Sequence, residues 1–177
     1  MSAQITSVSS VSTTTATAEP TAGGTATEAA AGETFIVSDS ATATTAATVN
    51  IPAATESGTV NLAIGTQGAM LSVTGEGTAT LSIGGANDAS GNALDQSGAA
   101  IGISDSYAGK VVADFSSAYV SSDATVNADA KLGGSTSTIG ENAPAGSVAG
   151  VNLYVNTGKG ADEIGGSDKN DFVRAGA

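Results

Sequence analysis

The chain of 177 residues lacks cysteine, histidine and tryptophan, and it has little aromatic or basic content. Without cysteine it can form neither a disulfide framework nor a thiolate metal site. Without histidine it lacks the commonest general base and the commonest transition-metal ligand. Three Tyr and three Phe make a thin core, because aromatic side chains bury the largest areas. We therefore expect an oligomer, or a chain that packs on a larger surface.

Cations are almost as scarce as aromatics. Five Lys and Arg residues stand against 17 Asp and Glu residues, which gives a formal net charge of −12. Such a surface repels phosphate backbones and anionic lipid headgroups, so we expect no nucleic-acid partner. No apolar run approaches about 20 residues, so we expect no membrane insertion. The N-terminal sequence MSAQITSVSSVS has no positive n-region or apolar h-region, so we expect no Sec signal peptide.

Motifs that carry catalytic chemistry are also missing from the sequence. It has no G-x-S-x-G elbow, no P-loop and no dinucleotide fingerprint before a helix. A glycosidase built on paired carboxylates would usually need aromatic platforms for its sugar, and there is no Trp to supply one. We therefore predict that the protein is not an enzyme.

What is present is a chain of three compositional parts. Residues 1–32 are nearly all Ser, Thr, Ala and Gly, and they predict a low-complexity extended arm that is disordered in the free protein. Residues 33–156 predict a β-rich domain, because short apolar runs alternate with polar residues and are bounded by Gly, Asn, Asp and Ser. These runs are Phe35–Val37, Val49–Ile51, Val60–Ile64, Leu71/Val73, Leu81/Ile83, Ile101/Ile103, Val111–Val112, Tyr119–Val120, Val126 and Val151/Leu153/Val155.

The stretch from Gly84 to Asp95 predicts the longest turn-rich insert. Asp88, Asn92 and Asp95 carry oxygen ligands that could hold Ca²⁺, but their spacing is not that of an EF-hand. We favour a type I′-like turn in which Gly91 and Asn92 adopt positive φ.

The third part, residues 157–177, contains two consecutive nine-residue units, TGKGADEIG and GSDKNDFVR. This pair resembles the calcium-binding nonapeptide of RTX (haemolysin-type) proteins, G-G-x-G-x-D-x-U-x, where U is a large apolar residue. Three positions depart from the pattern: Thr157, Ser167 and Lys169 stand where glycine belongs, and Lys169 puts a cation beside the implied metal.

The resemblance implies a calcium site, and Ca²⁺ is the one cofactor that the sequence suggests. Asp162 and Asp171 occupy the ligand positions of the repeat, while Gly158 and Gly160 offer tight turns and close carbonyl groups. Asp168 adds a nearby carboxylate. In the family an ion is shared between stacked turns, so two units would form at most a partial site, and we expect millimolar affinity at best. We favour the other interpretation, a Gly/Asp-rich surface hairpin that keeps the family's shape without its metal.

Together these features predict an all-β, sandwich- or solenoid-like domain of short strands, with a low-complexity N-terminal arm and an RTX-like C-terminal turn pair. We expect a non-enzymatic structural protein on the outside of a large assembly, bound to the protein subunits of that assembly. By composition it resembles phage capsid decoration (knob or cement) proteins, which would place it on a virion surface. The alternatives are a secreted RTX-type or S-layer-like surface protein bound to calcium, and the N-terminal part of an adhesin or tail fibre.

Overall fold

The fold is known from a computed structural model, which describes ten stretches of the chain. They are residues 11–12, 20–38, 45–116, 119–120, 126–129, 131–132, 139–142, 153–158, 162–166 and 171–175. Most of the predicted N-terminal arm, residues 1–10 and 13–19, lies outside them, and so do Gly160 and Asp168 of the predicted calcium site.

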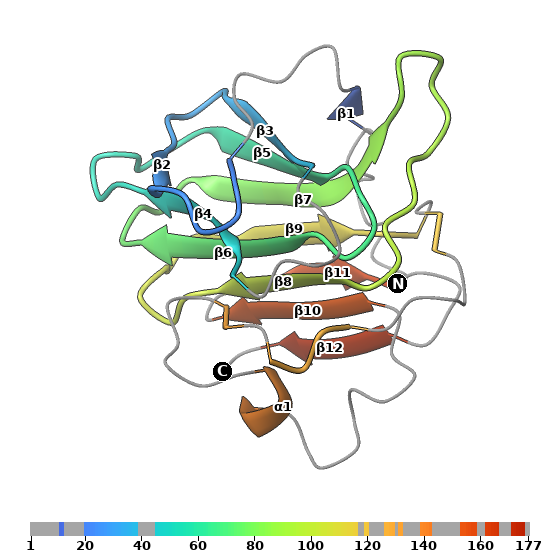
Figure 1. Cartoon of the computed structure of the whole chain (residues 1–177). Coiled ribbons are helices and arrows are strands. Elements are labelled where there is room, and N and C mark those ends of the chain that lie inside the picture. The colour runs from blue at the N-terminus through green and yellow to red at the C-terminus, as the bar shows by residue number, and fades with distance from the viewer. Residues whose placement is uncertain are drawn as a thin grey trace, which may run out of the picture.

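Two six-stranded sheets form the body of the protein (Figure 1). The first sheet has the order β11-β9-β7-β5-β3, with β1 also paired to β7. Its strands are β1 (Val11–Ser12), β3 (Thr34–Val37), β5 (Thr59–Ile64), β7 (Thr80–Asn87), β9 (Val111–Asp114) and β11 (Glu163–Gly165).

The second sheet has the order β12-β10-β8-β6-β4-β2. Its strands are β2 (Thr27–Glu28), β4 (Ala47–Ile51), β6 (Met70–Gly75), β8 (Ala99–Ile103), β10 (Leu153–Gly158) and β12 (Asp171–Ala175). The one helix in the described part of the chain is α1 (Ile139–Asn142), and that part contains no helix long and apolar enough to cross a membrane.

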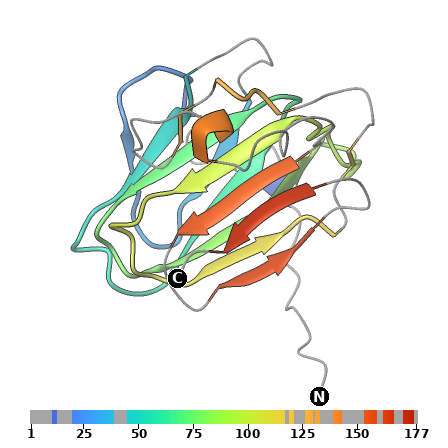
Figure 2. The same cartoon turned by 90° about the horizontal axis from the view of Figure 1, so that it is seen from below.

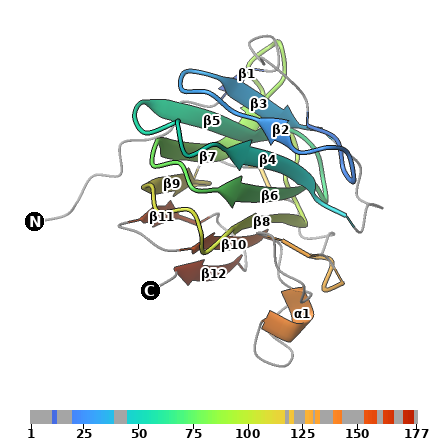
Figure 3. The same ribbon diagram turned by 90° about the vertical axis from the view of Figure 1, so that its left-hand side faces the viewer.

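Every ladder between named strands is parallel. From β2 onward, strands that follow one another in the chain lie in alternate sheets, so each strand pairs with the strand two places away in the chain. Two strands therefore make one turn of a coil, and the turns descend side by side through both sheets (Figure 3). We call this arrangement the coil.

The strand-rich character predicted from the sequence is confirmed, but the predicted fold class is wrong. We expected a sandwich- or solenoid-like domain with a separate arm and a separate terminal turn pair. Instead β2, which precedes residue 33, and β11 and β12, which follow residue 156, are strands of the same two parallel sheets. The boundary expected after residue 156 falls inside β10. Alternation identifies a strand because it is a local signal, but it does not specify the strand's partner or direction.

Columns of apolar side chains fill the space between the two sheets. In the first sheet the register stacks Phe35, Leu62, Ile83, Ala113 and Ile164, one from each turn. In the second sheet one column consists of Ala47, Leu71, Ile101, Val155 and Val173. Most of these side chains belong to one buried cluster. The coil therefore obtains a continuous core from aliphatic residues, which offsets its shortage of aromatic ones.

A smaller apolar cluster covers the outer face of the second sheet. Met70, Ala100 and Tyr154 are neighbours across three strands, and Val126, Leu132 and Ile139 of α1 pack on them. Tyr119, Val120 and Val126, predicted as strand, belong to no named strand among the described residues, and Tyr119 makes an isolated bridge with Asp95. Val126 covers the sheet instead of extending it, so its apolar character alone gave a wrong strand prediction.

Candidate functional site

The last turn of the coil contains the RTX-like residues and is the shortest turn of its column. Val155 of β10 pairs with Val173 of β12, so the chain completes this turn of the coil within the length of two nonapeptides. Every earlier turn, measured between paired residues of the same column, contains more residues. These turns run from Ala47 to Leu71, from Leu71 to Ile101, and from Ile101 to Val155. Ile164 and Val173, the two U residues, stand nine apart in the two core columns.

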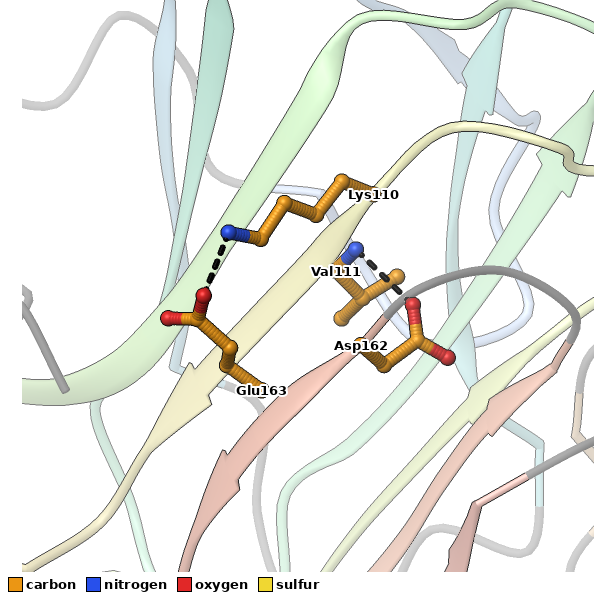
Figure 4. Close-up of polar contacts among 4 residues, drawn as sticks. All are labelled: Lys110, Val111, Asp162 and Glu163. Carbon is orange, nitrogen blue, oxygen red and sulfur yellow. Dashed lines mark hydrogen bonds and ion pairs between the residues drawn. The ribbon is translucent and has the colours of Figure 1, made fainter. Parts of the chain in front are cut away.

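Asp162 lies immediately before β11 and extends the ladder between β11 and β9. Its Oδ1 accepts a hydrogen bond from the main-chain N–H of Val111 at 3.1 Å (Figure 4). The regular register begins one residue later, where Glu163 pairs with Val112. The carboxylate therefore accepts one more hydrogen bond between β9 and β11, at the point where both strands begin. A hydrogen bond to a charged group is stronger than one between neutral groups.

An ion pair lies at the same edge of the coil. Lys110 Nζ lies 2.6 Å from Glu163 Oε1, and each side chain is 42% exposed (Figure 4). Exposed pairs of this kind contribute about 0–1 kcal/mol. The ion pair and the Asp162 bond join the same two neighbouring turns, although the paired residues are 53 and 51 residues apart in the chain.

Tyr107, in the loop before β9, is fully buried near this edge. Its hydroxyl donates a hydrogen bond to the carbonyl oxygen of Ala79 in the turn above. Burial, followed by the negative charge of Asp162, raises the pKa of Tyr107 from 10.0 to about 12. The two causes act in the same direction, since both disfavour a phenolate. The hydroxyl is therefore a neutral donor that joins turns of the coil.

The second predicted ligand, Asp171, lies at the opposite edge of the coil. Asp162 precedes β11, where strands of the first sheet begin, whereas Asp171 opens β12, where strands of the second sheet begin. Successive strands run in opposite directions (Figure 2), so β11 lies between the two carboxylates. A Cβ added to Gly166 would come within 2.7 Å of Asp171 Oδ2, which places this carboxylate against its own turn. The structure does not bring Asp162 and Asp171 together.

Of the remaining predicted ligands, Gly158 ends β10 just beyond a register shift. Gly160 and Asp168 lie outside the described residues. Among the residues that the structure does describe, no group of three or more Asp and Glu side chains is arranged to hold a metal ion.

Among the described residues, those around Asp162 do not fit the calcium site that the resemblance implies. One oxygen of Asp162 already accepts the Val111 amide. The neighbouring turn contributes an ammonium group, Lys110, which lies against Glu163. A divalent cation at this edge would be repelled by that ammonium. Protein groups thus already make the links between turns that an ion would otherwise supply.

The second candidate for calcium, the loop from Asp88 to Asp95, uses its oxygens within the turn. Asp88 Oδ1 accepts the amides of Ser90 and Asn92 at 2.8 and 2.9 Å. Asp88 Oδ2 accepts a third hydrogen bond, from Asn92 Nδ2 at 3.0 Å. This side-chain bond, followed by the main-chain bond from Asn92, lowers the pKa of Asp88. Gly91 has φ +85°, as predicted, but Asn92 does not have a positive φ, so the expected type I′ geometry is wrong.

Sequence analysis missed the contacts that Lys110, Val111 and Tyr107 make between turns. The only local signal was that Lys110 is the single cation before residue 130. Its partner is 53 residues away, and such a separation leaves no periodic pattern in the sequence.

Comparison with known proteins found no match among family models, curated proteins or solved structures. The likeness to RTX repeats therefore rests on the residues of the last turn alone and remains a prediction.

Proposed function

We propose that this protein is a non-enzymatic structural protein of the cell exterior, in which the coil is a rigid element that resembles an RTX-type roll. The observation that supports it is the length of the last turn. The step from Val155 to Val173 matches two nonapeptides, and the U residues Ile164 and Val173 occupy the core columns as the repeat requires.

The polar groups of the last turn and of the turns next to it support a structural role. Asp162 accepts a main-chain amide, Lys110 pairs with Glu163, and the Tyr107 hydroxyl donates to a carbonyl group. Each group links neighbouring turns of the coil. A chain without histidine or cysteine also lacks the commonest general base and a thiol nucleophile.

In this proposal residues 157–177 keep the shape of the RTX turn, and groups of the protein itself take the place of the metal. Lys110 contributes positive charge, and the Val111 amide contributes a hydrogen-bond donor to Asp162. The protein would therefore be a structural component that does not require calcium at this edge, rather than a calcium sensor.

Surface labelling of intact source cells would test the exterior location. A membrane-impermeant, amine-reactive biotin reagent would be applied before and after lysis, and the chain would then be recovered with a specific antibody. We expect the same labelling in both samples, with a cytosolic protein labelled only after lysis as the control. Labelling of this chain only after lysis would overturn the proposal.

The virion hypothesis remains a prediction, and the same material can test it. If the protein decorates a capsid, it should co-sediment with virus particles from the source and be labelled on those particles. Recovery on cells without particles would favour the RTX-type surface protein.

A further inference from the structure

We draw no further inference here: the strongest candidate, the exposed apolar surface around Val173 at the end of the coil that β11 and β12 form, carries none, because nothing in the structure shows what covers it.

Discussion

Replacement of Asp162 tests whether its carboxylate acts as a hydrogen-bond acceptor in the fold or as a metal ligand. In the structure its Oδ1 accepts the Val111 amide at 3.1 Å, and a hydrogen bond to a charged group contributes about 1.5–3 kcal/mol. Asp162 is half-buried, so we expect the lower part of this range, about 1.5 kcal/mol, for Asp162→Ala. Asp162→Asn keeps an acceptor oxygen and should cost about 0.5–1 kcal/mol.

The assay is urea unfolding followed by far-UV circular dichroism, in EDTA and in about 10 mM CaCl₂. A calcium site with a dissociation constant of about 1 mM would stabilise the wild type by about 1.4 kcal/mol at that concentration. If Asp162 acts through Val111, the cost of Asp162→Ala is the same in both solutions. The control is Asp105→Ala, in the exposed loop of the neighbouring turn, which should change stability by less than about 0.5 kcal/mol.

A different pattern would refute this reasoning. If Asp162→Ala costs nothing in EDTA, and its whole effect appears only with calcium, then Asp162 is a metal ligand and the hydrogen bond to Val111 is incidental. Titration of Tyr107 gives an independent check, because the charge of Asp162 helps to raise its pKa. The Asp162→Asn variant should therefore lower the pKa of Tyr107, whichever solution is used.

Two further predictions concern alkaline pH and backbone conformation. Because the pKa of Tyr107 is raised from 10.0 to about 12, the contribution of this residue to stability is complete below pH 10 and is lost as the pH rises toward 12. The midpoint of urea unfolding should therefore fall over this pH range more for the wild type than for Tyr107→Phe. Equal falls would contradict the burial argument. Gly75 (φ +106°) and Gly32 (φ +89°) both have positive φ, but an added Cβ would overlap the Ile51 carbonyl oxygen only at Gly75. Gly32→Ala should therefore cost about 1–2 kcal/mol and Gly75→Ala more than about 2 kcal/mol, and equal thermal-melting shifts would show that the Ile51 contact does not matter.

The residues of the strands could be predicted from the sequence because alternation is local. Val60 to Ile64, for example, alternates apolar and polar side chains as a half-buried strand does, and it lies within β5. Of the two apolar residues nine apart in the last turn, Ile164 of β11 packs against the main core, whereas Val173 of β12 is 43% exposed. The same local signals gave a wrong strand prediction at Val126, which covers a sheet without joining it.

The direction and order of the strands depended on the tertiary structure. Steps within one column differ widely in length, from the short step between Val155 and Val173 to the long one between Ile101 and Val155. The irregular loops between strands thus remove any fixed repeat that the sequence could display. The same holds for the site: Asp162 has the spacing of a calcium ligand, but its acceptor role depends on Val111, 51 residues away. Local sequence determined which residues form strands and turns, because backbone preference and burial act over a few residues. Only the stacking of distant turns decided what each strand pairs with and which groups surround the carboxylate.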